Sequence, residues 1–215
     1  MRAEIVKINS ETPESSLIKY AADQIRSGEV LGMPTDTFYG LAADPFNLRA
    51  VDKVYDIKTR SRHKPLSLLI ESVDQAEELA KALPEEFYAL ARKFWPGPLT
   101  LIVKAGSRLP LKVTANTGNV ALRVPNARIP RAVVTAAAIP ITATSANLSG
   151  ASECTTAEQV RDQLHGRIGI IVDGGTSPRD VASTIVDLSD ESERWRVIRE
   201  GAIPADEISR FFAQG

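Results

Sequence analysis

The sequence contains few of the residues that bind metals or form covalent cross-links. One cysteine, Cys154, and two histidines, His63 and His165, occur among its 215 residues. A single cysteine excludes an internal disulfide bond, and this set is too small for a typical zinc site. We therefore expect no metal site built from protein ligands. We interpret Cys154 as an ordinary small side chain rather than a nucleophile.

Several familiar segments and motifs are also absent. No stretch approaches the roughly 20 apolar residues of a membrane-spanning helix, and Met1 to Glu4 do not begin a signal peptide. The chain has neither the Gly-x-x-x-x-Gly-Lys-Ser/Thr loop nor the Gly-x-Gly-x-x-Gly turn, and two histidines do not suggest a Ser-His-Asp triad. We expect a soluble, cytoplasmic protein with no membrane partner. Any nucleotide must be held without a P-loop or a Rossmann turn.

The composition indicates one globular domain and no broad nucleic-acid surface. The apolar content of 43% can bury one substantial core, so we expect a single domain over residues 1–215. A formal net charge of -1 argues against extensive electrostatic binding of nucleic acid, although a local basic site remains compatible with it.

The pattern of apolar residues predicts a mixed α/β fold. Thr12 followed by Pro13 predicts a helix start, Asn47 predicts the cap of a second helix, and Ser72 with Gln75 predicts a capping box. About seven short apolar strands alternate with helices, which predicts one twisted mixed sheet flanked by helices. The main predicted segments are helices 85–94, 130–138, 156–164 and 204–213, and strands 30–34, 66–71, 99–104, 120–124, 139–144, 168–172, 184–188 and 195–199.

A basic segment follows the second predicted helix. Between Asp52 and Lys64 five cations face two acids, and the segment ends at Pro65. A solvated surface turn is the usual interpretation of such a run. Here the cations follow the helix rather than alternate with acids, and the proline fixes the exit of the loop. Lys58 and Arg60 combine a point cation with a planar fork, which suits a polyphosphate or a carboxylate.

A second polar motif follows the apolar run 139–144. Ser145 and Asn147 offer small neutral groups that can hydrogen-bond a sugar or acyl oxygen without adding charge. Taken with the basic segment, this motif predicts a small, anionic, nucleotide-like ligand.

Nine motifs occur in an order that resembles the YrdC-type threonylcarbamoyl-AMP synthases. The resemblance covers about Ile5 to Ile203. The resemblance implies a twisted, open α/β sheet with a concave, positively charged cavity, in a single domain without the additional C-terminal domain of longer members. The motifs are Pro34–Leu41, Lys58–Arg60, Lys64–Leu66, Trp95–Thr100, Arg123–Pro125, Thr144–Gly150, Asp173–Gly175, Ser183–Asp187 and Arg199–Gly201.

The resemblance also implies a reaction. L-threonine, bicarbonate and ATP would give L-threonylcarbamoyladenylate and pyrophosphate. The adenylate would pass to the tRNA threonylcarbamoyl-transferase machinery, which modifies position 37 of tRNAs that read codons beginning with A. All three substrates are anions, so catalysis would consist mainly of charge neutralisation and orientation.

By the same resemblance, four residues form the catalytic cluster. Lys58 and Arg62 would hold the ATP phosphates, together with Mg²⁺. Arg60 would orient the reacting carbonate and phosphate oxygens. Ser145 and Asn147 would complete the cluster with Lys58 and Arg60.

Further residues are implied at the two substrates. For ATP, beside Lys58, Arg62 and Ser145, they are Asn119, Glu153 and Arg199. For L-threonine they are Thr35, Ser67, Arg123 and Ser183. Residue types leave two alternatives open: Arg123 could be a cross-strand ion pair, and Thr35 a plain strand-end hydroxyl. Two positions depart from the family: Thr59 stands where a glycine is frequent, and Ser67 where one bacterial branch has a histidine.

Two other functions remain open. One is an RNA-binding or ribosome-maturation factor of the same fold, and weak RNA binding fits either case. The net charge and the scarcity of aromatic residues outside core-like positions count against it. The other is a sister-family enzyme with another carbamoyl or acyl substrate. The complete Lys-x-Arg and Ser-x-Asn motifs count against non-catalytic sisters.

Overall fold

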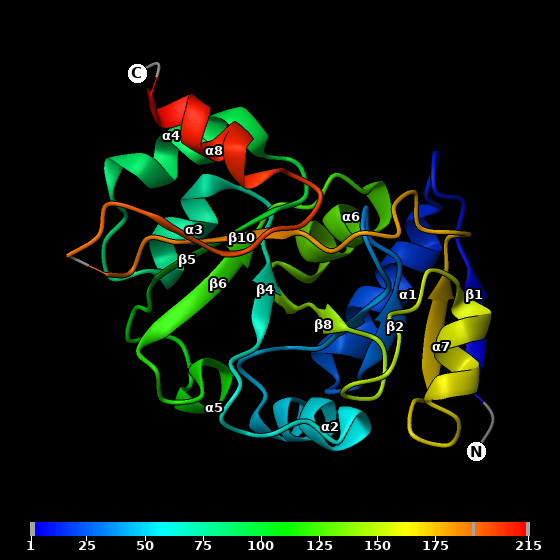
Figure 1. Ribbon diagram of the computed structural model, residues 1–215. Coiled ribbons are helices and arrows are strands. Elements are labelled where there is room, and N and C mark those ends of the chain that lie inside the picture. Colours follow the sequence, from blue (N-terminus) through cyan, green and yellow to red (C-terminus); the bar gives the residue numbers. More distant parts are fainter. Residues whose placement is uncertain (1–2, 191, 214–215) are drawn as a thin grey trace.

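Two open β-sheets flanked by helices make up the fold (Figure 1). The computed structural model describes residues 3–190 and 192–213. The strands are β1 (Glu4–Lys7), β2 (Leu31–Met33), β3 (Gly40–Ala42), β4 (Ser67–Leu69), β5 (Leu99–Lys104), β6 (Asn119–Arg123), β7 (Ile141–Thr142), β8 (Thr144–Ser145), β9 (Ile170–Asp173), β10 (Thr184–Asp187) and β11 (Arg196–Arg199). The helices are α1 (Ser15–Arg26), α2 (Leu48–Lys58), α3 (Val73–Leu79), α4 (Glu85–Phe94), α5 (Leu111–Thr114), α6 (Arg128–Ala137), α7 (Ala157–Gln163) and α8 (Ala205–Ala213).

The mixed α/β class is confirmed, with two sheets in place of the single one predicted. The smaller sheet has the order β1-β9-β2-β3-β8, and the larger has the order β11-β10-β5-β6-β4-β7. The predicted strand 139–144 divides into β7, which pairs with β4, and β8, which pairs with β3. The segment 141–145 therefore passes from one sheet to the other. It places Ser145 at the boundary between them.

Local sequence explains where two of the helices begin. The side chain of Asn47 accepts hydrogen bonds from the backbone of Arg49 and Ala50, so its predicted role as the cap of α2 is confirmed. Ser72 caps α3, but the Gln75 side chain accepts from the backbone N–H of Glu71 instead of Ser72. The predicted capping box is therefore only half formed.

The predicted start of the first helix at Thr12 is wrong. Helix α1 begins at Ser15 with Glu14 at its N-cap position. The side chain of Asn9 accepts from the backbone N–H groups of Glu11 and Thr12, and the Glu14 carboxylate accepts from the Asn9 N–H. These hydrogen bonds hold residues 9–14 in a local turn, and the helix starts after it.

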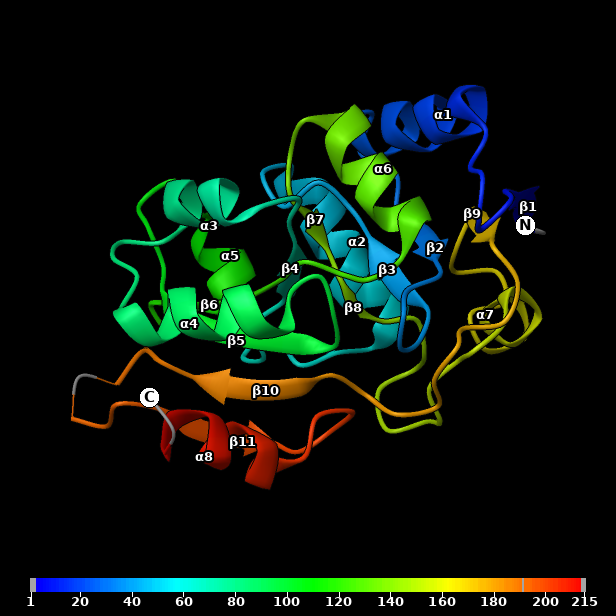
Figure 2. The ribbon, with the colours of Figure 1, turned by 90° about the horizontal axis from the view of Figure 1, so that it is seen from above.

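Helices cover the sheets from opposite sides. Figure 2 shows α1 and α6 next to each other on one side of the molecule, with β10, β11 and α8 on the other. Aromatic residues pack in the core: Phe87 of α4 is fully buried and contacts Trp95 edge-on at 5.4 Å between ring centroids. Within the described residues, no helix is long and apolar enough to span a membrane.

One face of the larger sheet forms the floor of a cavity. Side chains of paired residues point to the same side of a sheet. The register places Thr100 beside Ile185, and Ile102 beside Ala121. Leu69 lies beside Arg123 in the same way. These residues line a common cavity, which follows directly from strand register.

Candidate active site

The cavity lies between the larger sheet, the segment after β2 and the segment that joins the two sheets. Its volume is about 280 Å³, close to the lower end of the range of small-molecule sites. Seven of the predicted site residues line it, together with Arg60. These residues are Thr35, Ser67, Arg123, Ser145, Glu153, Ser183, Arg199 and Arg60.

Positive charge dominates the described lining. Arg60, Arg123 and Arg199 come from three separate parts of the chain, and Glu153 is the acid among them. Burial lowers the pKa of all three guanidinium groups from their ordinary value, and for Arg199 the charge of Glu153 acts in the opposite direction. An arginine retains its proton through such shifts. The cavity is therefore suited to a ligand with more than one negative charge.

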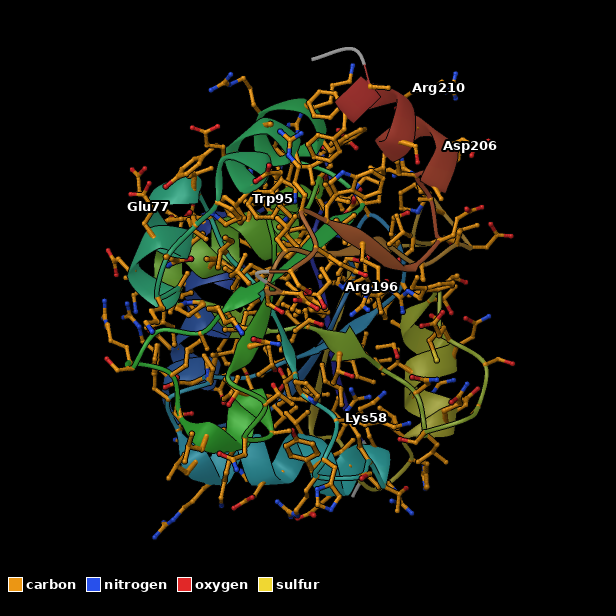
Figure 3. All side chains as sticks on the ribbon, turned by 60° about the vertical axis from the view of Figure 1, so that its left-hand side comes forward. Lys58, Glu77, Trp95, Arg196, Asp206 and Arg210 are labelled. Atoms are coloured by element: carbon orange, nitrogen blue, oxygen red, sulfur yellow. The ribbon has the colours of Figure 1, made fainter. Side chains whose placement is uncertain are left out.

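Lys58 is buried beside this cavity and is enclosed by oxygen atoms. Its ammonium donates to the backbone oxygens of Ser145 and Asn147, the latter at 2.9 Å, and to Asn147 Oδ1 at 2.9 Å. These three acceptors use all three protons of an ammonium group. Lys58 is the last residue of α2, and Figure 3 shows it inside the molecule, whereas Glu77, Asp206 and Arg210 project from the surface. Lys58 thus organises the segment that carries Ser145 and Asn147.

The Ser145 hydroxyl has a defined direction. It donates to Asn147 Oδ1 at 2.7 Å, and the Asn147 amide donates in turn to the backbone oxygen of Ala151 at 2.6 Å. With its hydrogen used, and with Lys58 Nζ as a donor at 3.4 Å, Ser145 Oγ retains a lone pair for a ligand in the cavity that it lines. It can therefore accept from an N–H group or contact a cation.

Burial lowers the pKa of Lys58 to about 8. The nearby positive charge of Arg60 acts in the same direction, and the negative charge of Glu153 opposes it. Lys58, Ser145 and Asn147, the predicted catalytic residues besides Arg60, form one hydrogen-bonded unit. Its charge is sensitive to moderately alkaline pH.

Thr59 turns the chain so that Arg60 can reach the cavity. Thr59 ends α2 in the left-handed conformation, with φ 51° and ψ 41°. This region favours glycine and is unfavourable for a β-branched residue. This backbone conformation explains why glycine is frequent at this position in the family that the sequence resembles. Arg60 then donates to the backbone oxygen of Pro65 at 2.9 Å.

Arg62 lies outside the cavity lining. It forms ion pairs with Asp52 and Asp56 of α2 and lies over the Tyr55 ring. Its side chain is 52% exposed. The basic segment is thus divided: Lys58 is buried, Arg60 faces the cavity, and Arg62 forms surface pairs. Its expected contact with the ATP phosphates stays a prediction.

Arg123 is both an ion pair and part of the cavity wall. Its guanidinium donates to Asp36 Oδ1 at 2.6 Å, to Thr37 Oγ1 at 3.0 Å and to the backbone oxygen of Gly97 at 3.0 Å. The side chains of Arg123 and Asp36 are 8% and 1% exposed. Asp36 belongs to the segment after β2, so the pair is not the cross-strand one considered from the sequence. The guanidinium still has two N–H donors free for a carboxylate.

Ser183 belongs to a small hydroxyl network. Its Oγ lies 2.9 Å from Thr100 Oγ1 and accepts from Arg199 Nη2 at 3.2 Å. The hydroxyls of Ser183 and Thr100 carry two hydrogens, and the hydrogen bond between them uses one. Among the described residues no other acceptor contacts this pair, so the remaining hydrogen is available to an oxygen of a ligand in the cavity.

Asn119 and Asn147 do not line this cavity. Asn147 lies behind Ser145, as described above. Asn119 lies on the same face of the sheet because it pairs with Lys104, but it borders a neighbouring depression with Lys104, Asp187 and Arg196. A ligand that contacts both Arg123 and Asn119 must extend along β6.

The sequence interpretation missed three residues at this site. Asp36, Thr37 and Thr100 lie within motifs quoted for the resemblance, yet no role was assigned to them. Asp36 and Thr37 hold Arg123, and Thr100 holds Ser183. Their place inside an ordered motif was the available signal.

The fold and the cavity define an open-sheet α/β protein with an arginine-lined site for a small anionic ligand. A sequence model of the Sua5/YciO/YrdC family, described as "Telomere recombination", matches residues 23–201. The chain belongs to this family.

Relatives with assigned names give a consistent picture. The chain is 37% identical to a threonylcarbamoyl-AMP synthase of Pyrococcus abyssi over 95% of its length, and 40% identical to one of Bacillus subtilis over 89%. It spans 59% and 55% of the lengths of these two relatives. A putative threonylcarbamoyl-AMP synthase of Mycobacterium tuberculosis is 34% identical, with 88% of this chain and 86% of the relative covered.

Solved structures agree with the fold. The structure of P. abyssi Sua5 complexed with L-threonine superposes with a TM-score of 0.93 at 36% identity, covering 97% of this chain and 61% of the other. The structure of E. coli YciO superposes with a TM-score of 0.87 at 23% identity, covering 96% and 99%. The latter supports the fold alone.

Proposed function

We propose that the protein forms L-threonylcarbamoyladenylate and pyrophosphate from L-threonine, bicarbonate and ATP. The observation that carries the proposal is the convergence of Arg60, Arg123 and Arg199 on one cavity whose wall includes Ser145. The names of the relatives and the threonine complex of Sua5 support it. The product would serve threonylcarbamoyladenosine formation at position 37 of tRNAs that read codons beginning with A. Its acceptor would be the transferase machinery in the cytoplasm.

The amino acid would bind at the sheet floor. Its carboxylate would meet the two free N–H donors of Arg123, and the remaining hydroxyl hydrogen of the Ser183–Thr100 pair would donate to one of its oxygens. Ser67 would lie next to the side chain of the bound threonine. The cavity volume of about 280 Å³ accommodates an amino acid and the reacting groups better than a whole nucleotide.

The chemistry then needs two displacements. The amine of threonine attacks the carbon of bicarbonate, water leaves, and a carbamate forms. A carbamate oxygen next attacks the α-phosphorus of ATP, and pyrophosphate leaves. Arg60 would stabilise the charge on the reacting oxygens. Lys58 and Asn147 would hold Ser145 so that its remaining lone pair accepts from the reacting nitrogen.

ATP would extend from the cavity along the larger sheet. Arg199 and Asn119 lie on the face that continues away from Arg123, and Arg62 could reach the phosphates only by leaving Asp52 and Asp56. Among the described residues no group of three or more metal-binding side chains occurs. Mg²⁺ would therefore enter with the triphosphate. Glu153 and Ser145 offer the oxygen ligands that suit it, and the ion would neutralise phosphate charge.

Pyrophosphate release provides the test of this proposal. We expect release to require both threonine and bicarbonate, and threonine to be preferred when the twenty amino acids are compared. A sister enzyme would respond to another substrate. An RNA-binding factor would show no release but tight tRNA binding with a steep salt dependence. We expect calorimetry to show ATP binding strengthened by threonine and only weak binding of bare tRNA.

A further inference from the structure

The Thr37 hydroxyl lies in a chain of hydrogen bonds with one direction. Thr35 Oγ1 donates its single hydroxyl hydrogen to the backbone oxygen of Phe38 at 2.7 Å. In the 3.1 Å contact between the hydroxyls of Thr35 and Thr37, Thr37 must therefore be the donor. Thr37 Oγ1 accepts in turn from Arg123 Nη1 at 3.0 Å. The chain thus runs from Arg123 through Thr37 and Thr35 to Phe38.

This chain leaves the Thr35 hydroxyl without capacity for a substrate. Thr35 Oγ1 also accepts from the Thr37 backbone N–H at 3.1 Å. Its hydrogen and both lone pairs are used within the segment. Although Thr35 lines the cavity, its hydroxyl is fully hydrogen-bonded within the segment after β2, and its contact with L-threonine stays a prediction.

Arg123 is held from three directions. Gly97 fixes Nε, Asp36 fixes Nη2 and Thr37 fixes Nη1. Two N–H donors remain, one on each terminal nitrogen, which is the number that a bidentate carboxylate requires. Asp36 supplies the charge that makes burial of the guanidinium tolerable. Thr37 is neutral, so its removal changes the orientation of Arg123 more than its charge.

We propose that Thr37, supported by Asp36, is a positioning residue that fixes Arg123 for recognition of the amino-acid carboxylate. The proposal rests on the function proposed above and deepens it. Asp36 and Gly97 keep Arg123 in the cavity wall when the Thr37 hydroxyl is absent. Loss of that hydroxyl allows the fork to rotate away from its bidentate orientation. Recognition of threonine weakens, while use of ATP changes little.

The test is Thr37→Val, which keeps the shape of the side chain and removes its hydroxyl. We expect the KM for threonine, and the Kd for threonine measured by calorimetry, to rise roughly tenfold, the lower end of the effect of losing a hydrogen bond to a charged group. The kcat and the KM for ATP should stay within about twofold. Thr37→Ser, which keeps the hydroxyl, should restore the threonine KM.

Thr142→Val is the matched control. Thr142 is also a buried threonine, 1% exposed, whose hydroxyl donates to the backbone oxygen of Leu41 at 2.8 Å, and it lies outside the cavity lining. It should lose comparable stability without any change in threonine KM. In an Arg123→Lys background, Thr37→Val should raise the threonine KM little further. Both changes act by removing the same oriented guanidinium group, so their effects are not additive.

Each contrary result has a distinct meaning. An unchanged threonine KM and Kd in Thr37→Val, a rise equal to that in Thr142→Val, or full additivity with Arg123→Lys would overturn the positioning role alone. A wild-type protein that binds threonine without releasing pyrophosphate would overturn the proposed reaction, and the Kd values would still decide the role of Thr37. A wild-type protein that binds no threonine would overturn both.

Discussion

Lys58 and Asn147, 89 positions apart in the chain, are joined by two hydrogen bonds of 2.9 Å, one to the backbone oxygen of Asn147 and one to its side-chain oxygen. This relationship makes the two short polar motifs a single unit. The end of α2 carries the cation, and the segment that joins the two sheets supplies its acceptors. Of the two cations in the Lys-x-Arg motif, Arg60 is therefore the one that faces the cavity.

Replacement of these two cations should therefore have different consequences. We expect Arg60→Ala to reduce adenylate synthesis roughly a hundredfold or more, the scale for losing a positioned electrostatic group, with little change in melting temperature. Lys58→Ala should reduce activity by a similar factor and also destabilise the fold by about 1–3 kcal/mol, because buried oxygens lose their donor. Steady-state kinetics and thermal unfolding measure the two effects. Near-normal synthesis by both variants would refute the assignment.

The lowered pKa of Lys58 predicts a pH dependence of stability. The folded-state pKa is about 8, below the ordinary value of 10.5. Between these values the unfolded chain binds more protons than the folded one, so the Lys58 contribution to the free energy of unfolding becomes more favourable as pH rises from about 8 to 10.5. Below that window the burial cost is present in full. Denaturant unfolding of wild type and Lys58→Met across this range should show their difference changing, and a constant difference would contradict the pKa.

Arg123→Lys tests the fork against the charge. Lysine keeps the positive charge opposite Asp36 but cannot make the three directed contacts and still offer two donors to a carboxylate. We expect a large rise in the KM for threonine and a much smaller change in ATP binding. Equal loss for both substrates, or a lower melting temperature with unchanged affinity for threonine, would indicate a structural arginine.

Thr59→Gly should stabilise the protein. Thr59 has φ 51° at the C-terminal end of α2. Glycine adopts this conformation without the steric cost that a β-branched residue incurs, so we expect a gain of about 1 kcal/mol after its greater flexibility in the unfolded chain is subtracted. Chemical denaturation measures it. Thr59→Ala should gain less, and a loss of stability in Thr59→Gly would show that the threonine side chain contributes contacts that outweigh the strain.

Cys154 should be unreactive in the folded protein. The side chain is fully buried, and burial raises the pKa of its thiol to about 11. Because the thiolate is the reactive form, we expect iodoacetamide to label Cys154 only after denaturation. Rapid labelling of the native protein, detected by mass spectrometry, would contradict the interpretation of this residue as an ordinary small side chain.

The sequence by itself determined much of the secondary structure, because the relevant interactions are local. Asn47 caps α2 through backbone groups two and three residues away, and α4 follows the predicted helix 85–94 to its ends. Asn9 forms a competing local turn ahead of α1, so this helix begins a few residues after the predicted start. The order of the motifs also sufficed to indicate the family, to which the chain belongs.

Only the tertiary structure decided what each cation does. Lys58, Arg60 and Arg62 lie within five positions of one another, and their surroundings differ because the left-handed Thr59 reverses the chain and Asp52 and Asp56 draw Arg62 back onto α2. The acceptors of Lys58, and Asp36 and Thr37 that hold Arg123, lie more than eighty positions away. Such contacts depend on the register of two sheets and on the segment that joins them. No local pattern encodes that register, so the direction of a side chain into a cavity, a core or solvent appears only when the chain is folded.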